Sequence, residues 1–228
     1  MIGPKIISAA TSKGGASKST TIGSIAGAFA KRGASVHVID ADPKLAVSEW
    51  MVAQDPKVEN ITSVAVKPDD FSDYLDDQDF SVYDYVLIDV AGYNDKTLML
   101  AMARSNLILV PLQPAATDLR HALETVKAAK TLYKNFGKSP LYRLVLSNID
   151  HLAMQEQIFI FKEIMRLKLD RFNTPLTHRK PYKTMQLTGY PPHFQEQTLS
   201  VSKAVAEVDM LIAEIDKLIG NHDQRKVA

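Results

Sequence analysis

The sequence contains no cysteine. This absence excludes disulfide scaffolds, thiolate zinc sites and cysteine nucleophiles, and it is compatible with a reducing compartment. No apolar run approaches the roughly 18 residues that a membrane-spanning helix requires. The N-terminus also lacks the basic flank and long apolar region of a secretory signal. We therefore expect a cytoplasmic protein with no stably inserted membrane segment.

An excess of charge of either sign is also missing. The chain has 27 Lys and Arg residues against 26 Asp and Glu residues, so its net charge of +1 supplies no global field for binding nucleic acid or membrane. Any contact with a polyanion must come from a local patch. We expect the 228 residues to form a single domain, because too few residues precede Lys5 for a separate N-terminal DNA-binding module.

Short apolar runs alternate with longer amphipathic stretches. The runs that predict buried strands are 5–10, 35–39, 61–66, 85–88, 107–112 and 141–146. The stretches that predict helices are 19–31, 45–53, 96–104, 118–136, 151–169 and 199–219. This alternation predicts an α/β fold with a doubly wound, mostly parallel sheet and helices on both faces. The last helix carries one apolar stripe, for which docking on the sheet is favoured over docking on a partner.

Two segments depart from the average composition. Residues 67–89 contain eight Asp and one Lys, which indicates a solvated acidic helix and loop, except for Asp89. Residues 166–183 contain six Lys and Arg against one Asp. From this basic segment the DNA-binding candidates are Arg171, Arg179, Lys180 and Lys183. The alternative is an ordinary solvated face.

The segment 12–21, SKGGASKSTT, lies directly between the first apolar run and the first helix. At such a junction backbone N–H groups and the helix dipole stabilise phosphate oxygens. The two glycines let the backbone approach closely, Lys18 can reach the terminal phosphates, and the hydroxyl of Ser19 or Thr20 can coordinate Mg²⁺. The segment predicts a site for a nucleoside triphosphate, and the alternative is a glycine-rich turn with solvated lysines.

The strict P-loop pattern, G-x-x-x-x-G-K-[ST], does not fit, because Ser12 and Ser17 stand at its two glycine positions. The segment instead resembles the deviant Walker A loop, K-G-G-x-x-K-[ST], of the ParA/MinD superfamily of ATPases. The resemblance implies that Lys13 crosses a dimer interface and adds charge to the transition state, as an arginine finger does. It also implies that ATP is bound by Lys13, Gly14, Gly15, Ala16, Ser17, Lys18, Ser19 and Thr20, with Lys13 and Lys18 catalytic.

Two acids close the second expected strand in VIDADP. Side chains at the carboxyl edge of a parallel sheet face the ligand crevice, where carboxylates can hold metal-bound water and position the attacking water. The stretch resembles the family's D-x-D-P-Q, with Lys44 in place of Gln. The match implies that Asp42 is the water-positioning catalytic residue and that Asp40 is an outer-shell magnesium ligand.

A third acid, Asp89, ends the hydrophobic stretch YDYVLIDVAG. This is the Walker B form, whose acid reaches Mg²⁺ directly or through water. Ser19, Asp40 and Asp89 are therefore the expected metal ligands. Ala91 and Gly92 stand where the family has its second switch, and Gly92 can bend there.

Two further matches concern loops after later strands. LILVPLQPAATDLRHA resembles the family's V-P-x-x-P strand end and Asp-led helix, which puts Pro111, Pro114 and Asp118 near the nucleotide and the dimer face. The alternative is a loop with Thr117 or Asp118 as a helix N-cap. Asn148 ends a later strand, where its amide can pair with the adenine edge, and the alternative is a turn-forming Asn.

The resemblance covers the chain to about residue 150 and, more loosely, its remainder. In length the chain is close to small ParA partition proteins and to VirC-type proteins of DNA transfer systems. Such proteins form an ATP-dependent homodimer that binds DNA without reading its sequence. Slow ATP hydrolysis reverses dimerisation and DNA binding, and a ParB-like or other DNA-binding partner stimulates this hydrolysis. We expect such an ATPase in plasmid or chromosome partition, nucleoid-associated when ATP is bound.

Other functions stay open. Within the family they are a VirC-like positioning protein for DNA transfer and a MinD-like membrane-associated switch. The alternatives of another functional class are a metabolic P-loop enzyme and an interaction protein that binds ATP as a switch with negligible turnover.

Overall fold

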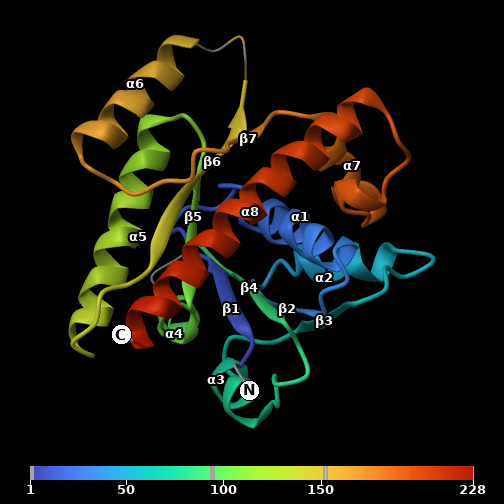
Figure 1. The fold of residues 1–228 in the computed structure, drawn as a ribbon, viewed down its shortest axis with the longest axis horizontal. Coiled ribbons are helices and arrows are strands. Elements are labelled where there is room, and N and C mark those ends of the chain that lie inside the picture. Colours follow the sequence, from blue (N-terminus) through green and yellow to red (C-terminus); the bar gives the residue numbers. More distant parts are fainter. Residues whose placement is uncertain (1–2, 93–95, 151, 153, 228) are drawn as a thin grey trace.

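A computed structural model describes residues 3–92, 96–150, 152 and 154–227. Its strands form one seven-stranded sheet in the order β3-β2-β4-β1-β5-β6-β7 (Figure 1). All neighbouring strands within it are parallel. The strands are β1 (Lys5–Ala9), β2 (Val36–Ala41), β3 (Ile61–Ala65), β4 (Tyr85–Val90), β5 (Leu107–Leu112), β6 (Tyr142–Ile149) and β7 (Leu176–Thr177). The predicted doubly wound parallel fold is confirmed.

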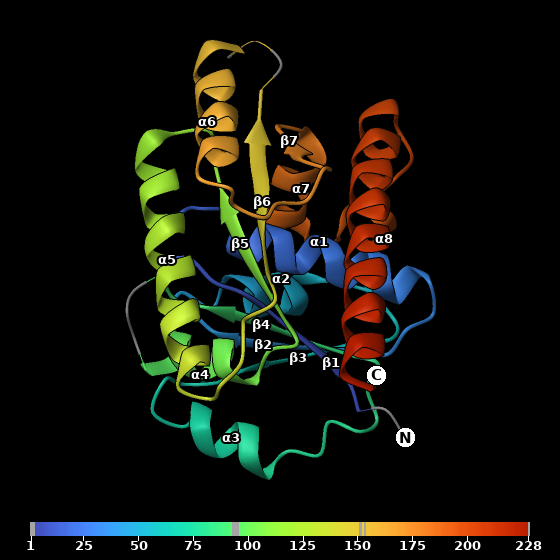
Figure 2. The same cartoon turned by 60° about the vertical axis from the view of Figure 1, so that its left-hand side comes forward.

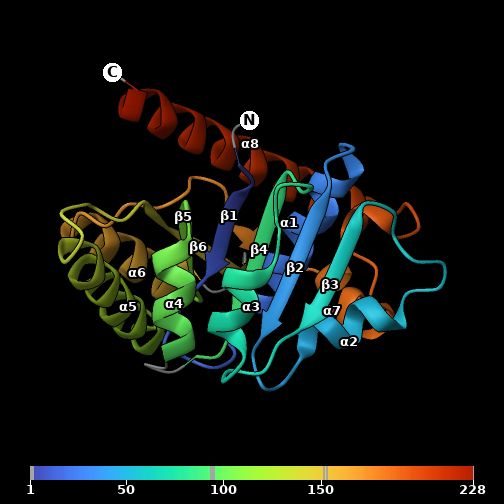
Figure 3. The ribbon, with the colours of Figure 1, turned by 90° about the horizontal axis from the view of Figure 1, so that it is seen from below.

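Helices cover both faces of the sheet. They are α1 (Lys18–Lys31), α2 (Ala46–Ala53), α3 (Phe71–Asp77), α4 (Lys96–Arg104), α5 (Ala116–Lys134), α6 (Met154–Arg166), α7 (Lys180–Thr188) and α8 (Leu199–Val227), with a 3₁₀ turn η1 (Pro192–Phe194). The helices α1, α2, α7 and α8 pack on one face and α3 to α6 on the other. Figure 2 shows α5 and α6 on the opposite side of the strands from α8, and Figure 3 shows α3 and α4 in front of the strands with α1 behind.

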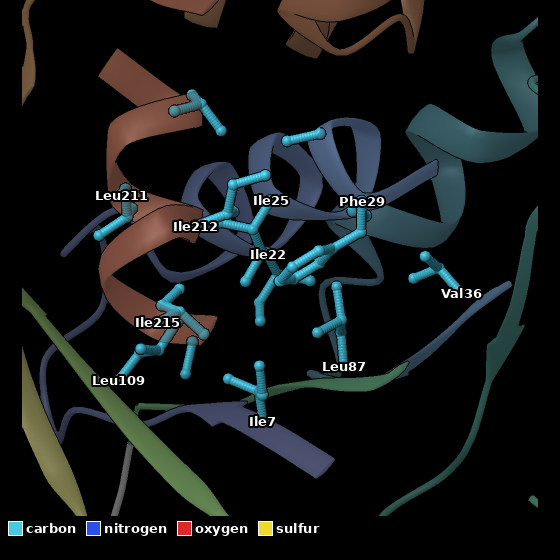
Figure 4. Close-up of a cluster of buried hydrophobic side chains, with 14 of the residues drawn as sticks. Ile7, Ile22, Ile25, Phe29, Val36, Leu87, Leu109, Leu211, Ile212 and Ile215 are labelled. Atoms are coloured by element: carbon cyan, nitrogen blue, oxygen red, sulfur yellow. The ribbon is translucent and has the colours of Figure 1, made fainter. Parts of the chain in front are cut away.

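The predicted apolar stripe of the last helix packs against α1 and the sheet. Leu211, Ile212 and Ile215 of α8 are fully buried and face α1 and the strands (Figure 4). They share one hydrophobic cluster with Ile25 and Phe29 of α1. Because this cluster supports α1 from behind, it fixes the helix whose first turn follows the phosphate loop.

The segment after α6 differs most from the sequence-based expectation. The basic stretch 166–183 contains strand β7 and the start of α7, neither of which the sequence predicted. The strand is two residues long, too short for a periodic pattern. The six strands predicted by apolar runs are present, and β6 extends beyond its predicted end to Ile149. The predicted helix 151–169 is observed as α6 from Met154, and His151 lies outside the described residues.

No helix among the described residues is long and apolar enough to cross a membrane.

Glycine permits a close contact between α1 and the chain beyond α7. A Cβ atom built on Gly27 would lie 2.3 Å from Cβ of Pro191, closer than real Cβ atoms approach. The same construction on Gly220 of α8 meets no atom within 4 Å. Packing, and not helix propensity, therefore requires glycine at position 27.

These two glycines give opposite predictions for the same substitution. Gly220→Ala is expected to raise the free energy of unfolding by up to about 1 kcal/mol, because alanine is the better helix former. Gly27→Ala is expected to lower it despite that propensity, because Pro191 must move. Urea denaturation of both variants measures the difference, and equal stabilisation would contradict the packing contact.

Candidate functional site

The phosphate loop is the chain between β1 and α1. Gly15 and Ser17 both adopt left-handed backbone conformations, with φ of 79° and 67°. Ser17 therefore takes the conformation that the second glycine of a standard P-loop adopts freely, at a cost of roughly 1–2 kcal/mol for a residue with a Cβ atom. A Cβ built on Gly14 or Gly15 meets nothing within 4 Å, so the loop presents open backbone.

The second lysine of the motif points into the loop. Lys18 is 5% exposed, and its Nζ donates a hydrogen bond to the Lys13 carbonyl oxygen at 3.3 Å. Burial lowers the pKa of Lys18, and the nearby carboxylates of Asp89 and Asp42 oppose this shift. A phosphate group at this point would supply the negative charge that stabilises the buried ammonium.

Asp89 is the least satisfied polar group of the site. It is fully buried at the end of β4, and neither carboxylate oxygen has a hydrogen-bond partner. Burial raises its pKa to about 7, while the Ser19 hydroxyl and the Lys18 ammonium nearby oppose that shift. A buried anion with two unpaired oxygens is costly unless a cation pairs with it. Asp89 therefore fits the role of a magnesium ligand together with the neighbouring Ser19.

Of the other two acids, Asp40 lies on β2 directly beside Asp89, and Asp42 follows the last residue of that strand. The sheet register pairs Asp40 with Asp89, so both are at the same edge. Asp40 is buried, and its two oxygens accept hydrogen bonds from the Asp42 and Ser48 backbone N–H groups at 3.2 and 2.8 Å. Burial raises the pKa of Asp40. Asp42 is half-buried and faces the open cavity, where a carboxylate can contact a substrate water.

A cavity of about 400 Å³ opens beside the loop. Six predicted nucleotide-binding residues line it, namely Gly15, Ser17, Lys18, Ser19, Thr20 and Asn148. Four others do not, namely Lys13, Gly14, Ala16 and Pro111. Pro111 is buried inside β5, opposite Val145 of β6, so its side chain is part of the sheet and not of the cavity wall.

Asn148 is a turn-forming residue that also lines the cavity, and its pairing with the adenine edge stays a prediction. It has a left-handed backbone with φ of 55°, as a turn-forming Asn does, and it lines the cavity. Its Nδ2 donates to Gln113 Oε1 at 3.2 Å, and Gln113 Nε2 donates to the Gly15 carbonyl oxygen at 2.9 Å. Gln113 thus connects Asn148 to the phosphate loop. Gln113 lies inside the V-P-x-x-P match but was not among the predicted site residues.

Lys13, the first lysine of the loop motif, is bound by helix α5 of its own chain. Lys13 forms an ion pair with Asp118, whose side chain is 1% exposed. The preceding residue, Ser12, forms a hydrogen bond with His121 at 2.9 Å. A Cβ atom on Gly92 would lie 2.8 Å from the Lys13 carbonyl, so the glycine permits this loop to pack closely. The helix begins at Ala116 and its N-cap is Ala115, so the alternative that Thr117 or Asp118 caps it is wrong.

The basic segment does not form one patch. Arg171 pairs with Leu144 near the start of β6, and its guanidinium lies 5.5 Å from the Phe161 ring centroid. Thr177 pairs with Ile149 at the other end of β6. Five residues of strand separate the two points, which is about 16 Å.

The other three basic candidates lie at the cavity end of β6. Arg179 lines the cavity and forms an ion pair with Glu207 at 2.6 Å. Lys183 also lines the cavity and is exposed, and Lys180 begins α7 and is exposed. Thr177, Arg179 and Tyr182 line the cavity although no sequence motif predicted them there.

The parallel sheet, the phosphate loop between β1 and α1, and the acids at the same strand edge define a P-loop NTPase of the ParA/MinD type. A family model described as VirC1 protein matches residues 4–218, and the chain belongs to that family. A curated relative, Protein ParA of Rhizobium radiobacter, is 29% identical over 185 residues, which cover 79% of this chain and 81% of the relative.

Solved structures share the fold. A variant of McdA from Cyanothece in complex with ATP has a TM-score of 0.71 at 13% identity, covering 96% of this chain and 98% of that one. A putative plasmid partition protein from Borrelia burgdorferi bound to AMPPNP has a TM-score of 0.68 at 16% identity, with 92% and 99% covered. The MinC:MinD cell division complex of Aquifex aeolicus gives 0.65 at 16% identity, with 92% and 96% covered.

The unpaired carboxylate of Asp89 predicts that removing its charge stabilises the ligand-free fold but weakens ligand binding. Asp89→Asn is expected to raise the free energy of unfolding of the ligand-free chain by about 1 kcal/mol or more, because it removes a buried, unpaired charge. The same change should weaken magnesium-dependent nucleotide binding. Urea denaturation at pH 8 with a chelator measures the first effect, and calorimetric titration measures the second.

Asp40→Asn is the matched control. Both oxygens of Asp40 accept backbone hydrogen bonds, so this change should lower the free energy of unfolding. If Asp89→Asn destabilises the ligand-free chain as Asp40→Asn does, Asp89 is not an unsatisfied charge.

Proposed function

We propose that this chain is an ATPase that binds Mg·ATP at the cavity beside the phosphate loop, dimerises on ATP, and binds DNA without reading its sequence. The observation that carries the proposal is the buried, unpaired Asp89 carboxylate beside Lys18 and the phosphate loop. Support also comes from the ATP and AMPPNP complexes of two proteins that share the fold. Hydrolysis of ATP to ADP and phosphate would reverse dimerisation and release the DNA.

Each residue has a role in this proposal. Backbone N–H groups of the loop and the Lys18 ammonium hold the phosphates, and Asp42 orients the attacking water. Ser19 and Asp89 would hold Mg²⁺, with Asp40 in the outer shell. When bound, Mg²⁺ neutralises charge that develops on the phosphate oxygens.

Lys13 is the residue whose proposed role requires a second copy. In the single chain its charge is neutralised by Asp118, which is almost fully buried. Dimerisation would exchange this carboxylate for the phosphates of the other subunit's nucleotide. A site completed in this way is incomplete in the monomer, so intrinsic turnover should be slow.

The cargo of the proposed ATPase is DNA. The Rhizobium radiobacter relative is named ParA, and one neighbour is described as a plasmid partition protein, which favours partition. Membership of the VirC1 family favours positioning of DNA for transfer as the second candidate. In either case a ParB-like or other DNA-binding partner would stimulate hydrolysis, and the ATP-bound dimer would associate with the nucleoid. A MinD-like, membrane-associated role is the remaining alternative, favoured only by structural likeness to MinD.

The nucleotide cycle predicts different assemblies for two variants. The wild-type chain should be dimeric with ATP and monomeric with ADP or without nucleotide. Lys18→Ala should stay monomeric throughout because it loses the phosphate-binding charge, whereas Asp42→Ala should remain dimeric long after ATP addition because water is no longer oriented. Light scattering coupled to size exclusion measures these masses, with phosphate release recorded in parallel. Normal hydrolysis by Asp42→Ala would refute its water-positioning role.

The position of the basic residues predicts which of them bind DNA. We expect Lys180→Ala and Lys183→Ala each to weaken binding of a random duplex severalfold with ATP present, and to reduce the salt dependence by about one charge per subunit. Arg171→Ala, at the far end of β6, is the comparison and should change affinity less. Fluorescence anisotropy between 50 and 200 mM salt measures both quantities. Unchanged affinity of both lysine variants at low salt would favour an ordinary solvated face.

A further inference from the structure

One buried carboxylate on the C-terminal helix holds three residues of the segment β7–α7. Glu207 of α8 is 8% exposed. It accepts hydrogen bonds from the Thr177 hydroxyl at 2.7 Å and from the Tyr182 hydroxyl at 3.1 Å. Arg179 donates to it through both Nε and Nη2, at 2.8 and 2.6 Å. The Thr177 backbone N–H also donates, at 3.2 Å.

All three of these partners line the cavity beside the phosphate loop. No α8 side chain that the structure describes is among the lining residues, so Glu207 acts on the cavity through its partners. The guanidinium plane of Arg179 is fixed because two of its nitrogen atoms bind the same oxygen. Burial and the Glu207 carboxylate raise the pKa of Tyr182, so its hydroxyl stays protonated and keeps donating.

The sheet order indicates which part of a nucleotide this wall meets. Asp42 follows β2 and Asp89 lies near the end of β4. Both strands are on one side of β1, so these acids mark the terminal-phosphate end of the site. Strands β6 and β7 lie on the other side of β1, beyond β5. Thr177 and Asn148 belong to that side and line the same cavity. A nucleotide whose phosphates occupy the loop therefore extends its base and ribose toward the wall held by Glu207.

We propose that Glu207 is a positioning residue for nucleoside recognition, because it orders Thr177, Arg179 and Tyr182 as the base-and-ribose wall before the ligand arrives. This inference rests on the proposed nucleotide binding. It moves Arg179 from the set of DNA contacts to the nucleotide site, and it couples α8 to nucleotide occupancy. Pre-ordered side chains increase affinity because the ligand does not have to immobilise them.

The same helix provides a matched control for this role. Glu214, two turns beyond Glu207 on α8, accepts hydrogen bonds from the Asn173 and Thr174 backbone N–H groups, both at 2.9 Å, and from the Thr174 hydroxyl at 2.6 Å. Its partners do not line the cavity. Glu207→Gln and Glu214→Gln should therefore both affect folding stability, whereas only the former should affect nucleotide affinity.

The experiment is calorimetric titration of the full chain, with Mg²⁺, using ATP, ADP and inorganic tripolyphosphate. We expect Glu207→Gln to weaken ATP and ADP binding about tenfold, because the ligand must then order the three wall side chains itself. The same change should leave tripolyphosphate binding unchanged. Glu214→Gln should match the wild type for all three. Urea denaturation of each variant confirms that the folded state is populated in the titrations.

The outcomes separate a failure of nucleotide binding from a failure of the positioning role of Glu207. If the wild type binds neither ATP nor ADP, the proposed function fails. If the wild type binds them but Glu207→Gln and Glu214→Gln have equal affinity for ATP, the positioning role is overturned. An equal loss of tripolyphosphate and ATP affinity also overturns it, because the defect would then not concern the nucleoside. If Glu207→Gln does not fold, Arg179→Lys provides the test, since it retains the charge but loses the two-nitrogen geometry, with the same expected results.

Discussion

The structure depends on one constraint: a fully buried carboxylate, Asp89, has no hydrogen-bond partner on either oxygen. Such a group is costly in a ligand-free protein, and burial accordingly raises its pKa to about 7. A metal cation bound at both oxygens would offset this cost. The phosphate loop and Lys18 lie beside Asp89, so the cation and the anionic ligand that would bind it are expected together. The proposed binding of Mg-nucleotide would therefore depend on this carboxylate at the end of β4.

The parallel sheet makes this arrangement possible. Parallel strands present their carboxyl ends at a single edge, so Asp40 and Asp89 come together by register although 48 residues of chain lie between them. The core behind that edge, formed by α1 and α8 against the strands, holds the first turn of α1 in place (Figure 4). Helix α8 contributes a second connection through Glu207, which reaches the far wall of the cavity. The C-terminal helix therefore supports both ends of the proposed ligand.

The parts of the site that the sequence predicted are those whose chemistry is contiguous. The loop 12–21 and the apolar strand ending in Asp89 each contain their motif within a few residues, so strand, loop and helix could be placed without tertiary information. The six strands carried by apolar runs were predicted for the same reason. Ser17 stands at a glycine position of the P-loop pattern, and its backbone is left-handed, the conformation that glycine adopts most easily.

The parts that the sequence did not predict depend on contacts between distant segments. Strand β7 is two residues long and is held by β6, and Arg179 faces the cavity because Glu207, 28 residues later, binds it. A list of basic residues therefore indicated one DNA-binding patch where the fold separates Arg171 from Arg179 along β6. The N-cap of α5 was missed because the helix begins earlier, at Ala116, without a side-chain cap.

The central claim, that a buried acid and a phosphate loop together form a Mg-nucleotide site, is tested most directly by calorimetric titration of the wild-type chain with ATP, with Mg²⁺ and then with a chelator. The account predicts one nucleotide bound per chain with Mg²⁺ and binding at least about tenfold weaker without it, because Asp89 would then remain an unpaired anion beside the phosphates. ATP affinity that is equal in the two conditions, or no binding in either, would contradict it.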